Sequence, residues 1–135
     1  HLKGLTNLRA LSLNHTRVTD AGLQYLKGLT SLAYLDLGRT QISDAGLQHL
    51  KGLTSLQVLE LYRTHVTDVG LEHLKELTAL KWLNVGGTQT SDAGLQHLKG
   101  LTRLQVLIPG KRVTDAAVNE LKKALPILGK PLPPR

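Results

Sequence analysis

The residues of this chain that could do chemistry recur at intervals of 24 positions. Two carboxylates, Asp36 and Glu60, are one interval apart, and two guanidinium groups, Arg39 and Arg63, follow them with the same spacing. In an enzyme, neighbouring carboxylates could divide the acid and base roles or hold a divalent cation. Because the arginines stand three residues away and could neutralise the acids, we favour salt-linked recognition or solvated ion pairs over catalysis and cation binding.

Three of the four aromatic side chains follow the same arrangement. Tyr34 and Trp82 share one position of the repeat with Val58, and Tyr62 lies at a neighbouring position. Exposed Trp and Tyr anchor protein interfaces, where one side chain contributes about 2 kcal/mol or more. The alternative is that the rings only cover a sheet and stabilise cross-strand pairs. The predicted partner-binding residues are Tyr34, Asp36, Arg39, Val58, Glu60, Tyr62, Arg63, Trp82 and Asn84.

Two further columns, of histidine and of lysine, fall outside this predicted surface. Neighbouring helices are about 10 Å apart, which is too wide for two imidazoles to share one ion at about 2.1 Å each. No metal or other cofactor is therefore predicted. The lysines have no interleaved aromatics, so they are interpreted as a solvated helix face, with binding of nucleic acid or another polyanion as the alternative. The columns are His1, Tyr25, His49, His73 and His97, and Lys3, Lys27, Lys51, Lys75, Lys99 and Lys122.

The elements that must position these residues follow from the hydrophobic spacing. Each interval begins with an alternation, as in Leu11-Ser12-Leu13, which is typical of a short strand with its leucines inward. The spacing then changes to three, as in Leu23, Leu26 and Leu29, which is typical of one face of a short helix. Each interval is thus predicted to be one coil made of a strand, a turn, a helix and a return.

The ends of the predicted helices have their own signals. Thr19-Asp20, which recurs in every interval as Ser or Thr before Asp, predicts an N-cap followed by an acid at the positive end of the helix dipole. Gly28, Gly52 and Gly100 follow the last helical residue and predict a left-handed turn there. These positions are therefore assigned to the backbone.

A single coil has only one row of inward leucines and cannot bury it alone. Successive coils must stack and pair their strands into a parallel sheet. Because helices need about 10 Å of width and strands about 4.8 Å, the helical side should be convex and the strand side concave. The fold class is therefore an α/β solenoid, and the predicted partner-binding residues lie on its concave strand face.

The repeated motif LxxLxL is followed by Thr at 16, 40, 64 and 88 and then by [VI]-[ST]-D-x-G-L-x-x-L. This pattern resembles the leucine-rich repeat family. It is most similar to bacterial 24-residue repeats related to the cysteine-containing subclass, with Thr in place of Asn or Cys. The resemblance implies a right-handed solenoid that is a protein-binding scaffold, not an enzyme, and that is often a module of a longer chain.

The domain organisation follows the repeat. Residues 1–125 are predicted to form the repeat domain, which opens with a partial repeat and closes with a cap helix at about 115–125. The fifth coil is one residue shorter than the others and carries Pro109 where an inward Leu is expected. A proline-rich tail is predicted at 126–135. Since no equivalent cap guards the first coil, we expect either upstream sequence or self-association through that edge.

Composition excludes several kinds of site and disfavours one class of partner. The chain has no cysteine, which excludes a disulfide framework, a Cys-ligated zinc site and a thiol nucleophile, and no apolar run approaches the roughly 20 residues of a membrane span. The net charge of +7 would favour nucleic acid if it were focused on one face. Five of the ten acids are assigned to helix starts, which spreads the basic excess over the outside and disfavours nucleic acid. Another protein is the predicted partner, and a purely structural segment of a larger protein is the alternative; the sequence specifies neither ligand nor compartment.

Overall fold

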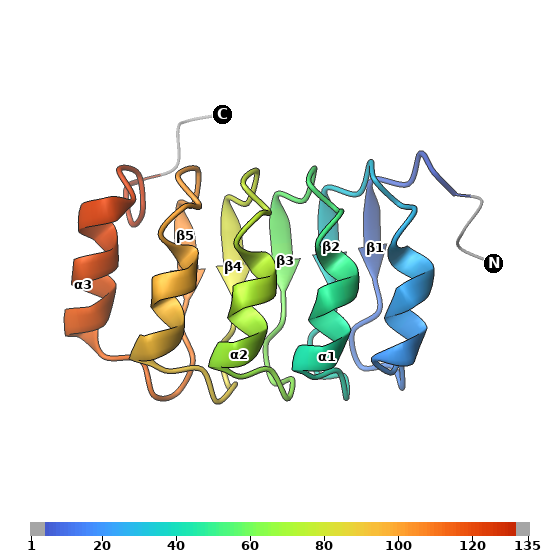
Figure 1. The fold of residues 1–135 in the computed structure, drawn as a ribbon, viewed down its shortest axis with the longest axis horizontal. Helices are drawn as coiled ribbons and strands as arrows, with labels where there is room; N and C mark the ends of the chain where they lie inside the picture. Colours follow the sequence, from blue (N-terminus) through green and yellow to red (C-terminus); the bar gives the residue numbers. More distant parts are fainter. Residues whose placement is uncertain (1–4, 132–135) are drawn as a thin grey trace.

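The computed structural model describes residues 5–131, which form a row of stacked coils (Figure 1). Each coil contributes one short strand and one short helical segment. His1, Lys3 and the end of the proline-rich tail lie outside the described residues. The strands are β1 (Ala10–Ser12), β2 (Tyr34–Asp36), β3 (Val58–Glu60), β4 (Trp82–Asn84) and β5 (Val106–Ile108). The helical segments are η2 (Ala21–Leu26), α1 (Asp44–Leu47) with η3 (Gln48–Leu50), α2 (Asp68–Leu71) with η4 (Glu72–Leu74), η5 (Asp92–Leu98) and α3 (Asp115–Ala124).

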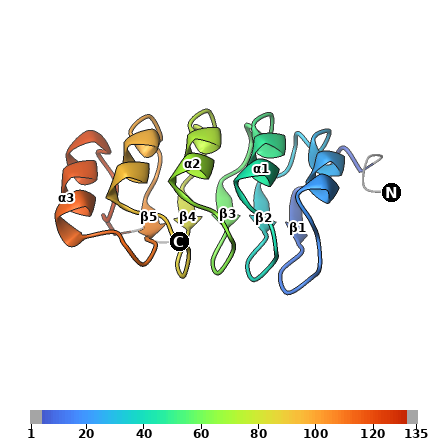
Figure 2. The ribbon, with the colours of Figure 1, turned by 60° about the horizontal axis from the view of Figure 1, so that its bottom comes forward.

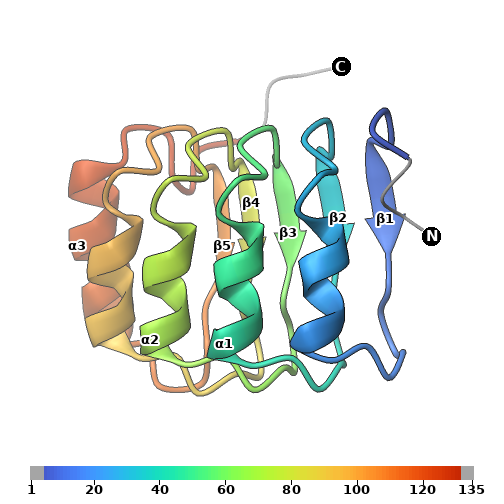
Figure 3. The same ribbon diagram turned by 45° about the vertical axis from the view of Figure 1, so that its right-hand side comes forward.

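The five strands form one parallel sheet in the order of the sequence. The pairing register equals the repeat, since Leu35 pairs with Leu59 and Leu59 with Leu83. Figure 2 shows the coils following one another from the N-terminal to the C-terminal end, and Figure 3 shows the helical segments on one side of the sheet. The expected α/β solenoid is confirmed. We call the side of the sheet opposite the helices the strand face.

The core lies between the sheet and the helical segments and consists of stacked leucines. Leu35 and Leu59 reach it from the strands, and Leu23 and Leu26 reach it from the first helical segment; all are buried. The spacing of three matches the 3₁₀ geometry observed for η2, because three residues per turn place side chains i and i+3 one above the other. Full burial of each such leucine contributes about 1.5–3 kcal/mol.

The first coil is less well buried than the others. Leu11, Leu13 and Val18 are only half-buried, while Leu37 and Leu61 at equivalent positions in later coils are inaccessible to solvent. The reason is geometric, since β1 has a neighbouring strand on one side only within the described residues.

A threonine fixes the turn that follows each of the first four strands. The hydroxyl of Thr40 donates to the Leu37 carbonyl at 2.7 Å, and that of Thr64 donates to the Leu61 carbonyl at 2.7 Å. Both threonines are buried, so these bonds satisfy hydroxyls that would otherwise be costly in the core. Thr16 and Thr88 repeat the contact.

Ser43, Thr67 and Ser91 are at the N-cap positions, as predicted, but their hydroxyls bond to the preceding coil. Ser43, Thr67 and Ser91 make no side-chain bond to their own helices. Instead the Ser43 amide donates to Asp20 Oδ1 at 2.7 Å, and the Ser43 hydroxyl donates to Asp20 Oδ2 at 2.5 Å. Asp44–Thr67, Asp68–Ser91 and Asp92–Thr114 repeat this pair of bonds. We call these four contacts the aspartate rungs. Only Thr114, at α3, and Thr19 also accept an amide of their own helical segment.

The predicted left-handed turns at Gly28, Gly52 and Gly100 are wrong. Among the described glycines, positive φ occurs at Gly87 and Gly129. The helical segment continues into a further right-handed turn, in which the Leu29 amide donates to the Leu26 carbonyl at 2.9 Å. The left-handed position lies instead in the loop after the strand.

Candidate functional site

Two rows of side chains run across the strand face, as the sequence predicts. The pairing register places Tyr34, Val58 and Trp82 side by side in the first row. Tyr34 is 37% exposed, and the other two are half-buried. The second row, two residues later, contains Asp36, Glu60, Asn84 and Ile108.

The Asp36 carboxylate is on this face but is not free to contact a partner. The side chain is buried, with 5% of its surface exposed. Asn14 Nδ2 donates to Asp36 Oδ2 at 2.9 Å, and the Gly38 amide donates to Asp36 Oδ1 at 2.9 Å. Both oxygens are therefore used, and Asp36 supports the loops that follow β1 and β2.

Glu60 retains more capacity for recognition. Asn84 Nδ2 donates to Glu60 Oε2 at 2.8 Å, and Asn84 Oδ1 accepts the Gly86 amide at 2.9 Å. Glu60 Oε1 has no hydrogen-bond partner among residues 5–131. The two acids of the second row thus bond to opposite neighbours, which separates them functionally and leaves Glu60 as the available carboxylate.

The expected neutralisation of these acids by Arg39 and Arg63 does not occur. Within residues 5–131 the ion pairs are Glu72–Lys75 and Glu120–Lys123, both on the helical side. Arg39 and Arg63 have left-handed backbones, with φ of 55° and 53°, and both are exposed in the loops after the strands. Arg39 Nη1 donates to His15 Nε2 at 2.8 Å in the neighbouring loop.

Tyr62 leans over the loop of the preceding coil. Its ring lies so close to Gly38 that a β-carbon at that position would overlap it, so any larger residue there would displace the ring. The pKa of the neighbouring Tyr34 is raised, first by burial and then by the negative charges of Asp36 and Glu60 and by Tyr62. Tyr34, Tyr62 and Glu60 are therefore close enough to interact, and the neutral form of the Tyr34 hydroxyl is favoured.

Trp82 has an unusual polar group. Its indole Nε1 is buried and has no hydrogen-bond partner within residues 5–131. An unsatisfied buried donor costs about 1–3 kcal/mol. Trp82 is therefore not an optimal choice for folding at this position, because an apolar ring would avoid that cost.

The loops after the strands form a cationic edge that the sequence analysis did not identify. They comprise residues 14–19, 38–43, 62–67, 86–91 and 110–114, which we call the loop edge. It contains five of the 17 Lys and Arg residues and none of the ten acids. An open hollow of about 620 Å³ at this edge is lined by Arg63, Thr64, His65, Gly87, Gln89 and Lys111. The signal that could have found it is the column His15, Arg39, Arg63, Gly87 and Lys111, together with the absence of acids from these segments.

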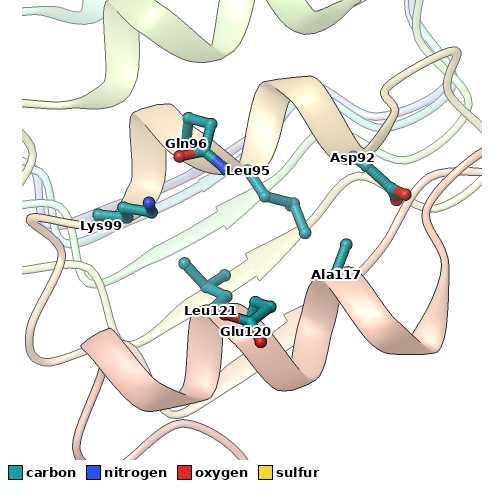
Figure 4. Close-up of a pocket in the computed structure, with 7 residues that line it drawn as sticks. All are labelled: Asp92, Leu95, Gln96, Lys99, Ala117, Glu120 and Leu121. Carbon is teal, nitrogen blue, oxygen red and sulfur yellow. The ribbon is translucent and has the colours of Figure 1, made fainter.

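A second hollow lies on the helical side, between η5 and α3 (Figure 4). It has a volume of about 270 Å³, an apolar floor that includes Leu95 and Leu121, and a polar rim that includes Glu120. Lys123 donates to Glu120 at 2.8 Å, and this hydrogen bond lowers the pKa of Glu120. The hollow is the seam between the last regular coil and the closing helix.

The members of the histidine and lysine columns within residues 5–131 lie on the helical side, as predicted. His49, His73 and His97 are half-buried there, and Lys27 and Lys51 are exposed. No group of three potential His, Cys, Asp or Glu ligands within residues 5–131 could hold a metal ion. No helix in the same part of the chain is long and apolar enough to cross a membrane.

Comparisons with known proteins agree with this architecture. A sequence model of the family described as leucine rich repeat matches residues 6–66 and, in an overlapping match, residues 30–90. An internalin (InlF) of Listeria monocytogenes has a TM-score of 0.74 and 31% identity over 90% of this chain and 34% of its own. Internalin C2 of the same species has a TM-score of 0.62 and 28% identity over 94% of this chain and 62% of its own.

A more distant likeness concerns the fold alone. The C-terminal domain of tropomodulin from Caenorhabditis elegans has a TM-score of 0.68 and 19% identity over 90% of this chain and 84% of its own. No curated protein sequence matches the chain. The chain spans about a third of the internalin InlF chain and under two thirds of internalin C2.

Proposed function

The chain belongs to the leucine-rich repeat family, whose members are generally protein-binding scaffolds, and we propose that it binds a partner protein through its strand face without catalysing a reaction. The observation that carries this proposal is the row of Tyr34, Val58 and Trp82, with Tyr62 beside it. These side chains lie outside a core that is already filled by leucines.

Two features of the rings favour binding over simple coverage of the sheet. Tyr34 remains more than one third exposed, and Trp82 carries the cost of an unsatisfied indole N–H. Neither feature is expected if the rings serve only stability. At an interface, in contrast, one such ring contributes about 2 kcal/mol or more when a partner covers it.

Fewer polar residues of the strand face are available to contact a partner than the sequence suggests. Glu60 offers a carboxylate oxygen beside Tyr34, and Asn84 holds that carboxylate in place. Asp36 is a supporting residue, since both its oxygens are occupied. We propose a partner surface with apolar side chains next to a cation or a hydrogen-bond donor that reaches Glu60.

Rigidity also favours recognition. The strand face is held by a continuous parallel ladder, and the rungs tie each coil to the next. Little conformational entropy should therefore be lost on association. A purely structural role, the alternative, predicts instead that every substitution on the strand face leaves partner binding unchanged.

The test is affinity capture from a native extract, followed by measurement of Kd for the captured partner. The Tyr62→Ala/Trp82→Ala variant should weaken binding by roughly tenfold to a hundredfold. Trp82→Phe should retain most of the affinity, because it preserves the ring. Lys27→Ala/Lys51→Ala on the helical side is the matched control and should bind like the unaltered chain. Equal affinity of all variants would contradict the proposal.

A further inference from the structure

The loop edge carries a concentration of positive charge that the strand-face proposal does not use. Its segments follow the strands and gather along one side of the solenoid, the lower edge in Figure 1. No acid occurs within them. The basic residues of the loop edge are Arg17, Arg39, Arg63, Lys111 and Arg112, with His15 and His65 among them.

The backbone fixes the walls of the hollow in this edge. The Arg63 amide donates to the Gly86 carbonyl at 2.8 Å, and the Lys111 amide donates to the Thr88 carbonyl at 3.2 Å. Three consecutive loops are thereby held side by side. Arg63 and Lys111 come from the outer two loops, so the hollow between them is defined by main-chain hydrogen bonds.

Gly87 gives the Arg63 side chain its place in the hollow. A β-carbon at Gly87 would lie 2.8 Å from Arg63 Cγ, so the arginine stem crosses the space that a side chain would otherwise occupy. Gly87 has a φ of 74°, a conformation that glycine adopts without strain. The absence of a side chain at residue 87 therefore admits the Arg63 stem into the hollow.

The cations of the hollow have no counter-charge within residues 5–131. Neither Arg63 nor Lys111 forms an ion pair there. The acid that follows the third loop, Asp68, has both oxygens bonded to Ser91, at 2.7 and 2.5 Å. Exposed like charges that share a hollow repel each other, and a bound anion would remove that repulsion.

We propose that this hollow binds a small ligand that carries several phosphate or sulfate ester groups. A guanidinium group matches the two oxygens of such an ester, an ammonium group adds a point charge, and the Gln89 amide is a further donor. The volume of about 620 Å³ is within the range of small-molecule sites, about 300–1,000 Å³. It is too large for one tetrahedral anion, and cations from two loops would each bind one ester group.

The experiment is isothermal titration calorimetry with inositol hexakisphosphate and sucrose octasulfate as the phosphate and sulfate probes. The loop-edge variant is Arg63→Gly/Lys111→Ala, in which glycine suits the left-handed backbone of residue 63. The matched control is Lys27→Ala/Lys51→Ala, which removes the same charge from the helical side. Circular dichroism verifies that both variants fold.

We expect at least one probe to bind the unaltered chain and the loop-edge variant to bind it roughly tenfold or more weakly. The control variant should lose less than about threefold. Preference for one probe would identify the ester as phosphate or sulfate. Absence of binding by both probes, or an equal loss in the two variants, would overturn the proposal, because an equal loss would reflect net charge alone.

Discussion

One position in the loop after each of the first four strands has a left-handed backbone, which costs free energy of folding for any residue except glycine. It is occupied by His15, Arg39 and Arg63 in the first three coils and by Gly87 in the fourth. For residues other than glycine this conformation costs about 1–2 kcal/mol. In three coils the chain thus carries a polar side chain at the loop edge at some expense of stability.

Substitution of a glycine with positive φ and substitution of a glycine with open space around it should change stability in opposite directions. Gly87→Ala should lower the free energy of unfolding by about 1–2 kcal/mol, because the new β-carbon meets Arg63 Cγ at 2.8 Å and φ is 74°. Gly28→Ala should be neutral or stabilising by up to about 1 kcal/mol, since nothing lies within 4 Å of its β-carbon position. Urea denaturation of both variants checks this. A similar loss for both would contradict the assigned backbone geometry.

The raised pKa of Tyr34 predicts a specific alkaline titration. Because folding favours the neutral phenol, the folded chain holds this proton at pH values where the unfolded chain has released it. Stability should therefore fall as the pH rises through and above the ordinary tyrosine pKa of about 10. Glu60→Gln removes one of the negative charges and should bring the Tyr34 titration to lower pH, as measured by phenolate absorbance near 295 nm. A Tyr34→Phe variant identifies the Tyr34 signal, and an unmoved titration would contradict the proximity of Glu60.

At the scale of single residues, the sequence predicts on which face a side chain lies better than it predicts the burial and contacts of that side chain. The repeat correctly puts Tyr34 and Asp36 on the strand face, because residues two apart on a strand share a side. It does not predict that Asp36 is buried or that it accepts a hydrogen bond from Asn14, 22 residues earlier. Nor does it predict the direction of Arg39 and Arg63, which follows from a loop conformation without a glycine signal. The binding role of these residues stays a prediction.

The aspartate rungs are the main polar link between neighbouring elements. Each joins the start of one helical segment to the start of the next. In the first three rungs the carboxylate also lies against a glycine of the next segment, as Asp20 does against Gly46. This explains why Ser or Thr, Asp and Gly recur together. The Ser or Thr donates backward, the Asp accepts from the next coil, and the Gly leaves room for the approach.

Removal of a rung aspartate should lower the free energy of unfolding more than removal of Asp115, which is at the equivalent position of the last helix but forms no rung within residues 5–131. Asp44→Ala removes the acceptor of the Thr67 amide and hydroxyl, at 2.7 and 2.5 Å. We expect a loss of about 2–4 kcal/mol, because two hydrogen bonds to a charged group disappear. Asp115→Ala, at an exposed helix start, should cost about 0.5 kcal/mol through the helix dipole. Thermal unfolding of both variants measures the difference, and equal losses would show that the acids act only as helix-start charges.

The sequence predicts these elements, but it assigns the wrong hydrogen-bond partner to the Ser or Thr hydroxyl that precedes three of them. Ser or Thr before Asp satisfies the same pattern in a capped helix and in a rung. Only the stacking of coils distinguishes the two, because the carboxylate comes from 23 residues earlier. The 3₁₀ geometry, in contrast, agrees with the spacing of three between Leu23 and Leu26.

The solenoid as a whole could be predicted because one period governs both sequence and pairing. Each strand meets its neighbour in the register of the repeat, so self-similarity alone determines the strand order. The closing coil departs from that period, and Thr114 follows its rung partner Asp92 by 22 residues instead of 23. An altered register there is expected from the shorter sequence.

Stability should vary along the solenoid, because each coil contacts only its neighbours. The half-buried Leu11 and Leu13 indicate weak protection at the first coil, and the inaccessible Leu59 and Leu61 indicate strong protection in the third. Hydrogen exchange measured by mass spectrometry should show faster exchange in a peptide covering 10–16 than in one covering 58–64. Equal exchange would show that the whole chain opens as one unit.

The interchangeability of the aspartate rungs has an evolutionary consequence. Excision of residues 44–67 would join Ser43 directly to Asp68 and would leave the Asp20–Ser43 and Asp68–Ser91 contacts with their original partners. Loss or duplication of a whole unit therefore creates no mismatched junction, so copy number can drift by recombination. The same interchangeability also permits misfolding. A unit that does not pair with its neighbour while the chain folds can form an equivalent contact with a later unit.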